Sequence, residues 1–158
     1  MKYHTACEPP LAALDHSVAS AVAFFRQIDE ELSDGHETAR EVLSHLVYWH
    51  NANVGIAWAL VTHRVPPFFT GRYIDLNAKA TDALRSESID ALCHMFAHRQ
   101  RQLVRALRRL PDWGIEFPVK DGCLTVSAAR HLHDTDAHIR GHIMRLKRAT
   151  LDQVQVIE

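Results

Sequence analysis

The sequence predicts an all-α protein, a four-helix bundle with one long crossover between the second and third helices. Apolar residues recur at spacings of three and four along most of the 158 residues, and the chain has only 6 Gly and 6 Pro. Four long periodic segments with one long connection are typical of a bundle. At this length the whole chain, residues 1–158, is expected to form a single domain.

Local signals place the first two helices. Pro9 and Pro10 suit a helix start, and the first helix is expected to end near residues 33–35. Asp34 can cap the second helix, with Glu37 three residues later completing a capping box, and this helix is expected from about residue 36 to residue 63. The apolar stripe of the first helix consists of Leu11, Leu14, Val18, Val22, Phe25, Ile28 and Leu32.

The connection over residues 72–85 is too long for a tight hairpin, and a short helical piece is expected within it. Ser86 or Ser88 can then cap the third long helix. Leucine and phenylalanine side chains form the core stripe of this helix. The stretch 111–114, Pro-Asp-Trp-Gly, is expected to end it.

The segment before the fourth helix reads as a loop or a small hairpin. Residues 115–124 contain Pro118 and the turn pair 121–122, Asp-Gly, which interrupt a helical pattern. Thr125 can cap the fourth helix. Its apolar stripe predicts a helix that runs to about Ala149.

Composition narrows the function classes. The formal net charge is -1, and the five arginines between residues 99 and 109 lack interleaved aromatic residues, so nucleic acid is not expected as a partner. No uncharged apolar run is long enough to span a bilayer, and no signal peptide is recognisable. Cys7, Cys93 and Cys123 are odd in number and far apart, which predicts no disulfide and favours a cytoplasmic location.

The densest group of ligand-type side chains lies at residues 131–142, which contain four histidines and two aspartates. His138 and His142 are four residues apart, so on a helix they share one face with roughly 6 Å of axial rise between them. Two imidazoles in this arrangement can bind one metal ion. Because a catalytic metal usually takes three protein ligands, a further ligand is expected from a distant helix.

The second helix supplies two candidates for that ligand. His45 lies at the edge of the core stripe, and His50 lies on a neighbouring strip. Periodicity alone does not choose between them. A single histidine in such a position is more often a hydrogen-bonded core or boundary residue than a ligand.

Residues 38–49 resemble the second-helix motif of the DinB-like four-helix bundles, in which the histidine, here His45, is a metal ligand. Residues 76–78 and 122–126 resemble the crossover of that family and its entry to the fourth helix. The resemblance covers roughly residues 10–148. It implies an up-down-down-up bundle, often dimeric, with a three-histidine site that holds nickel or zinc. Members with known activity include thiol-dependent transferases and isomerases that use mycothiol or bacillithiol.

The fourth helix departs from the family pattern, which has His-Asp-x-x-His and a Gln three residues later. Here His133 is followed by His138 at a spacing of five, which turns the two to different faces. The spacing of four is restored by His138 and His142, with Arg145 at the Gln position. The alternative register uses Asp134 with His138 as a carboxylate–histidine pair.

The expected site is therefore His45, His138 and His142 around a divalent metal, with Arg140 or Arg145 holding a substrate anion. The expected function is a metal-dependent enzyme of the thiol S-transferase or hydrolase type, which acts on a small molecule with a low-molecular-weight thiol as possible cofactor. The alternative is a non-catalytic bundle that binds metal or a small ligand in a stress response. An open metal position that faces a pocket would favour the enzyme.

His94 and His98 are also four residues apart, on the third helix, and could in principle form a rival site. The preferred reading is a histidine strip at a bundle or subunit surface. Together with the family resemblance, this strip predicts a homodimer whose interface is made by helices.

Overall fold

The computed structural model describes residues 8–155, with side chains to residue 152. The chain folds as a helical bundle with a small antiparallel sheet, so the helical class predicted from the sequence is right and the sheet is added to it. The elements in order are α1 (Glu8–Phe25), α2 (Ala39–Val61), α3 (Tyr73–Ala83), α4 (Ile89–Leu107), β1 (Glu116–Pro118), β2 (Thr125–Ser127) and α5 (Ala128–Gln155).

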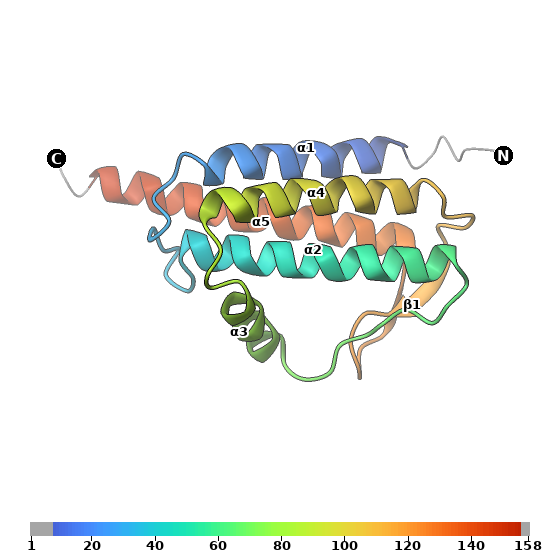
Figure 1. Cartoon of the computed structure of the whole chain (residues 1–158). Coiled ribbons are helices and arrows are strands. Elements are labelled where there is room, and N and C mark those ends of the chain that lie inside the picture. The colour runs from blue at the N-terminus through green and yellow to red at the C-terminus, as the bar shows by residue number, and fades with distance from the viewer. Residues whose placement is uncertain (1–7, 156–158) are drawn as a thin grey trace.

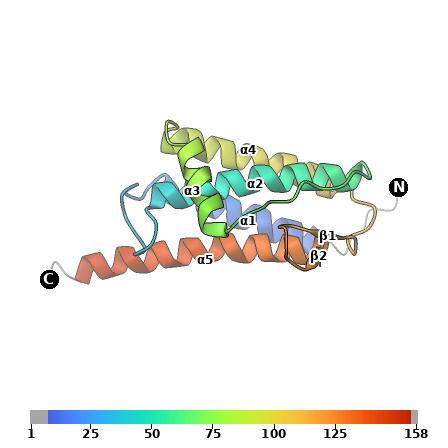
Figure 2. The same cartoon turned by 90° about the horizontal axis from the view of Figure 1, so that it is seen from below.

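The four long helices lie side by side, and the short helix α3 lies across them beside α2 (Figures 1 and 2). Helices α2 and α4 run in one direction, and α1 and α5 run in the opposite one (Figure 1). The main packing pairs are α2 with α4, α1 with α5 and α1 with α4. Two neighbouring helices that run the same way need a long return path, and the segment with α3 provides it.

Each long helix buries one apolar face in a common core. Leu14 of α1, Leu43 of α2, Phe96 of α4 and Leu146 of α5 are all fully shielded from solvent. Within each helix, the buried apolar residues follow the 3.6-residue period that the sequence shows. The same faces also bury a few polar side chains, among them His45, His50 and His142, and these make the site described below.

The first helix is shorter than predicted, because it ends at Phe25 and not near residues 33–35. Asp29 forms a turn of its own, in which its carboxylate accepts a hydrogen bond from the backbone N–H of Glu31 and its carbonyl accepts one from Leu32. Leu32 is still buried. Its place in the apolar stripe therefore reflects core packing of a loop residue and not helical structure.

The cap of α2 is Thr38 and not Asp34. Its hydroxyl accepts from the backbone N–H of Glu41, and the Glu41 carboxylate accepts from the backbone N–H of Thr38, which makes a complete capping box. Asp34 forms the preceding turn, where it accepts from the backbone N–H groups of His36 and Glu37. This turn and the cap together hold Glu37 at the entrance to α2.

The third long helix begins as predicted, with Ser88 as its cap. The fourth begins two residues later than predicted, because Thr125 pairs with Pro118 in the sheet, and the Ser127 hydroxyl accepts from the backbone N–H of Arg130 in the first turn of α5. Gly122 has a φ of 74°, which suits it to the turn of this hairpin. Helix α5 continues beyond residue 149 to Gln155.

Cys93 is buried and Cys123 is exposed, and neither forms a disulfide, whereas Cys7 lies outside the described residues. Within residues 8–155, no helix combines the length and the apolar character that a bilayer crossing requires.

Removing the hydroxyl that caps α2 should destabilise the bundle. Thr38→Ala leaves a backbone N–H group of the first turn without a partner, so we expect the free energy of unfolding to fall by about 1 kcal/mol. Urea unfolding followed by circular dichroism measures this loss. Thr62→Ala is the control, since the Thr62 hydroxyl donates to carbonyls at the end of the same helix and caps no N–H group. Equal losses in both variants would contradict the role of the cap.

Candidate metal centre

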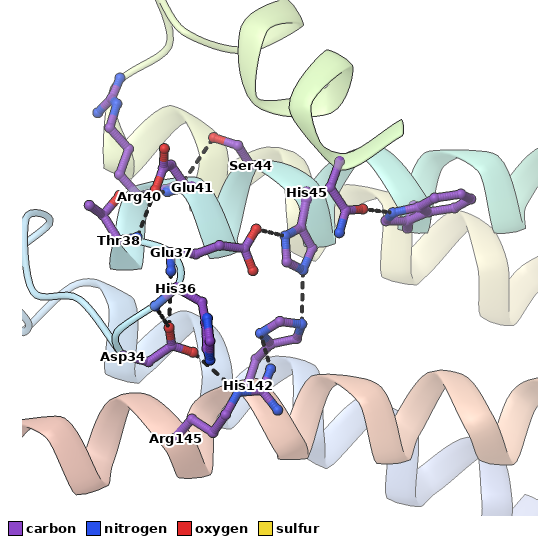
Figure 3. A network of polar contacts seen from close by, with 12 residues as sticks. Asp34, His36, Glu37, Thr38, Arg40, Glu41, Ser44, His45, His142 and Arg145 are labelled. Atoms are coloured by element: carbon purple, nitrogen blue, oxygen red, sulfur yellow. Dashed lines mark hydrogen bonds and ion pairs between the residues drawn. The ribbon is translucent and has the colours of Figure 1, made fainter. Parts of the chain in front are cut away.

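His45 is fully buried in α2 and is oriented by Glu37. Its Nδ1 lies 2.9 Å from Oε1 of Glu37 (Figure 3). An ionised carboxylate can only accept a hydrogen bond, so Nδ1 carries the proton. The lone pair of the neutral ring is then on Nε2, which points towards α5.

His138 and His142 lie one turn apart on α5 and face His45. The Nε2 atoms of His142 and His45 are 3.0 Å apart, and the ring of His138 is 4.6 Å from that of His142, centre to centre. One nitrogen of each histidine lies within 4.8 Å of the other two. Within the described part of the chain, this is the one group of three or more histidine, cysteine, aspartate or glutamate side chains that could hold a metal ion. Three imidazoles at this spacing match the ligand set of an open divalent-metal site.

Arg145 lies against the outer edge of His142. Its guanidinium is 2.7 Å from Nδ1 of His142, and its Nε donates to Asp34 at 3.1 Å (Figure 3). The Asp34 side chain is only 2% exposed. Burial alone would raise the pKa of Asp34, but the hydrogen bonds from Glu37, His36 and Arg145 outweigh it and hold that pKa below its ordinary value.

The contact with Arg145 determines where the proton of His142 lies. A guanidinium can only donate, so Nδ1 of His142 accepts, and the neutral ring carries its proton on Nε2. This proton points at the lone pair on Nε2 of His45. Coordination of a metal through Nε2 of His142 would require the proton to move to Nδ1 and Arg145 to withdraw.

The surroundings keep two of the three histidines neutral. The pKa of His142 is lowered to about 3 by burial and by the neighbouring His45, His138 and Arg145. His138 is more exposed than the other two, and partial loss of solvent, His45 and Arg145 likewise lower its pKa to about 4. Neutral imidazole is the form that binds a metal. Near pH 7 neither His138 nor His142 therefore has to release a proton to the solvent before it binds a metal ion.

A cavity of about 490 Å³ opens beside this cluster. His138 belongs to its wall, together with Trp49 of α2, Phe69 of the crossover and Tyr73 of α3. Trp49 donates a hydrogen bond to Asn77 at 2.8 Å, which joins α2 to α3 across the cavity wall. The polar side chains on the wall include His50, Asn53, His131, Asp134, Thr135 and His138.

His50 belongs to this wall and not to the histidine cluster. It is 2% exposed, and its Nε2 lies 2.7 Å from Oε1 of Gln100. Burial lowers its pKa to about 4, and the hydrogen bond with Gln100 opposes this only in part. The structure thus separates the two candidates of the second helix: His45 joins His138 and His142, and His50 lines the cavity.

The remaining candidates lie apart from the cluster. Arg140 pairs with Asp136 at 2.9 Å, and neither Arg140 nor Arg145 lines the cavity. Asp134 lies on the cavity wall, where its carboxylate accepts from Arg130. His133 is 71% exposed. His94 and His98 are exposed on α4.

Several residues around the site were not predicted from the sequence. Local spacing could have indicated Asn53, which lies three residues after the candidate His50 on α2, and also His131 and Thr135, which lie four apart on α5. Asp15 and Gln100 gave no local signal, because their contact joins residues 85 positions apart. Glu37 was expected only in a capping box, whereas its carboxylate bonds to His45.

A crystal structure of the mycothiol-dependent maleylpyruvate isomerase matches with a TM-score of 0.73 at 17% sequence identity, over 88% of this chain and 60% of that one. A mutant of the same enzyme matches with a TM-score of 0.70 at 18% identity, over the same shares of the two chains. The chain has the fold of this isomerase.

The likeness to this isomerase is one of fold. It supports the resemblance to the DinB-like bundles, and the chain spans about 60% of the length of the isomerase. No protein-family model matches the chain, and no curated protein matches it either.

The buried histidines should make stability fall in mild acid. His50 is neutral in the fold with a pKa of about 4, whereas in the unfolded chain it takes up a proton near 6.5. Below pH 6.5 the unfolded state therefore binds more protons, and stability present at pH 7 is lost as the pH falls towards 4, by about 3 kcal/mol from His50 alone.

Chemical unfolding between pH 7.5 and 4.5 measures this dependence. His50→Gln should flatten the loss, because glutamine does not titrate, while the exposed His133→Gln should leave it unchanged. A loss equally steep in wild type and His50→Gln would contradict the assignment.

Proposed function

We propose that this chain is a divalent-metal-dependent enzyme that uses a low-molecular-weight thiol, with His45, His138 and His142 as its metal ligands. The observation that carries the proposal is the position of His138, which belongs both to the histidine cluster and to the cavity wall. A metal bound there would have one side open to a ligand of small-molecule size. A closed site, with protein ligands on all sides, would favour the alternative of a non-catalytic metal-binding bundle.

The side chains around the cluster have separate roles in this proposal. Glu37 keeps the proton of His45 on Nδ1, so that Nε2 is ready to bind. A divalent ion held by three neutral imidazoles would lower the pKa of a bound thiol or water and so supply a nucleophile at neutral pH. The aromatic wall, with Trp49 held by Asn77, would exclude water from the bound molecule.

The reaction class follows from the thiol. An S-transferase or an isomerase of the thiol-dependent kind is favoured by the fold shared with a mycothiol-dependent enzyme, and a hydrolase would need only bound water. Nickel and zinc are the proposed metals, because imidazole ligands suit both. Arg140 and Arg145 hold carboxylates outside the cavity, so in this proposal Arg145 acts on His142 and neither arginine contacts the substrate.

A transfer assay tests the proposal. The protein loaded with zinc or nickel is mixed with mycothiol or bacillithiol and monochlorobimane, so that the thiolate sulfur bonds to the carbon that bears chlorine and chloride leaves. Transfer that requires the metal and is lost in His138→Ala supports the thiol enzyme. Ester hydrolysis without thiol would favour a hydrolase, and metal binding without turnover would favour the non-catalytic bundle.

Two further features belong to the same proposal. The directions of the long helices in Figure 1 support an up-down-down-up topology. A homodimer is proposed from the family resemblance and from the exposed positions of His94 and His98 on α4.

Each of the three ligand histidines should be needed for metal binding. We expect His45→Ala, His138→Ala and His142→Ala each to abolish tight binding of zinc or nickel, because two imidazoles do not hold the ion as three do. Metal analysis after gel filtration and titration calorimetry measure this. Asp134→Ala and His133→Ala are the controls and should retain the metal. Loss in Asp134→Ala with retention in His142→Ala would establish the other register.

Arg145 should weaken metal binding in the native chain. Arg145→Gln replaces a group that can only donate by one that can accept from Nδ1–H of His142, so we expect zinc affinity to rise about tenfold. Competition with a chelating dye measures the affinity. Arg148→Gln is the control, because it removes the same charge from an exposed position three residues further along α5, and it should have little effect. Weaker binding in Arg145→Gln would show that Arg145 supports His142 as a ligand.

A further inference from the structure

A second chain of hydrogen bonds runs from the surface of the bundle to the cavity. Asp15 on α1 accepts from Nε2 of Gln100 on α4 at 2.6 Å. Oε1 of the same Gln100 lies 2.7 Å from Nε2 of His50 on α2. Gln100 and His50 are both buried, and the ring of His50 packs edge to face against Phe96.

The order of donors and acceptors in this chain allows one arrangement of protons. The carboxylate of Asp15 can only accept, so Gln100 must present its amide NH₂ to it. The carbonyl oxygen of Gln100 therefore faces His50, and Nε2 of His50 must carry the proton. Since burial lowers the pKa of His50 to about 4, the ring is neutral near pH 7, and its Nδ1 holds a free lone pair.

This lone pair has no hydrogen-bond partner within residues 8–152. Nε2 makes the one hydrogen bond of the His50 side chain among the described residues. In the same part of the chain, no enclosed side-chain nitrogen or oxygen is left without a partner. Nδ1 is therefore not sealed in the core, and His50 has the cavity on one side.

The hydrogen bonds of His131, a second histidine on the cavity wall, also determine where its proton lies. Thr135 donates to the carbonyl of His131, so its oxygen accepts from the amide NH₂ of Asn53 at 3.4 Å. Oδ1 of Asn53 then accepts from Nε2 of His131 at 2.9 Å, which leaves Nδ1 of His131 as an acceptor. The described residues that line the cavity include no lysine or arginine, and the carboxylate of Asp134 on its wall is paired with Arg130.

We propose that His50 is a ligand-binding residue of the cavity, whose Nδ1 accepts a hydrogen bond from a hydroxyl or N–H group of the bound molecule, and that Asp15 and Gln100 position it. His131 offers a second acceptor on the facing helix. The cavity then selects a molecule rich in hydroxyl or N–H groups and disfavours a carboxylate at this wall. This inference deepens the proposed function and rests on it for the thiol end of the ligand.

The first experiment reads the proton directly. Long-range ¹H–¹⁵N correlation spectra of histidine-labelled, zinc-loaded protein distinguish a ring protonated at Nε2 from one protonated at Nδ1. We expect His50 of the wild type to be protonated at Nε2. In Asp15→Asn the amide of Gln100 can turn over, so a signal from the other tautomer should grow. Protonation at Nδ1 in the wild type, or no change in Asp15→Asn, would overturn the proposal.

The second experiment compares two thiols of similar ring size. The probes are 1-thio-β-D-glucose, which carries hydroxyl groups, and cyclohexanethiol, which carries none, and calorimetry measures their binding to the zinc-loaded protein. The variant is His50→Gln, whose amide can still donate to Gln100 but has no acceptor at the place of Nδ1. We expect it to lose on the order of tenfold in affinity for the thiosugar and nothing for cyclohexanethiol.

The outcomes separate the two proposals. Equal losses for both thiols would mean that His50 only maintains the structure, which overturns its role as an acceptor. Unchanged affinity for the thiosugar would overturn it as well. If neither thiol binds wild-type protein, the thiol enzyme is refuted, and the tautomer spectra still decide whether His50 presents a free Nδ1.

Discussion

The hydrogen bonds of the buried histidines end on groups that act in one direction only, and this constraint organises the interior of the bundle. Glu37 can only accept, so it leaves His45 with a lone pair on Nε2. Arg145 can only donate, so it leaves His142 with a proton on Nε2. Asp15 acts through Gln100 to place the proton of His50. Without these partners each buried ring would exchange between two tautomers, and the site would have no defined donors and acceptors.

Burial of apolar side chains explains which parts of the fold the sequence could predict. Apolar periodicity depends on burial, so it located the four long helices and their core faces. It did not locate the helix ends, because a loop residue such as Leu32 can be buried as deeply as a helical one. The cap of α2 was placed four residues early for a related reason: Asp34 does accept from two backbone N–H groups, but in a turn that precedes the helix.

For the site, residues close together in the sequence were predictable and distant partners were not. A spacing of four indicated that His138 and His142 share a face, and a motif on the second helix singled out His45. The contact that joins the two helices links residues 97 positions apart, and no local pattern encodes it. The geometry also gives Arg145 a place that the anion-binding expectation missed. Its guanidinium donates to Nδ1 of His142, whereas the glutamine that the family has at this position could accept a hydrogen bond from Nδ1–H.

The composition of the cavity wall bears on which molecule this bundle binds. The likeness to the isomerase, at 17% identity over 60% of its chain, is one of fold, so the side chains of the cavity wall determine which molecule fits. Its side chains include acceptors on two neutral histidines and the carboxylate of Asp134, which is paired with Arg130, and the guanidinium groups of Arg140 and Arg145 lie on carboxylates elsewhere. No described lysine or arginine lines the wall, so an anionic group would find its counter-charge at the histidine cluster, once a cation is bound there. In the proposed function, a thiolate would bind the cation at the histidine cluster, and hydroxyl or N–H groups along the rest of the molecule would donate to the histidines of the wall. The hydrogen bonds around His45 and those around His50 would then serve the same bound molecule.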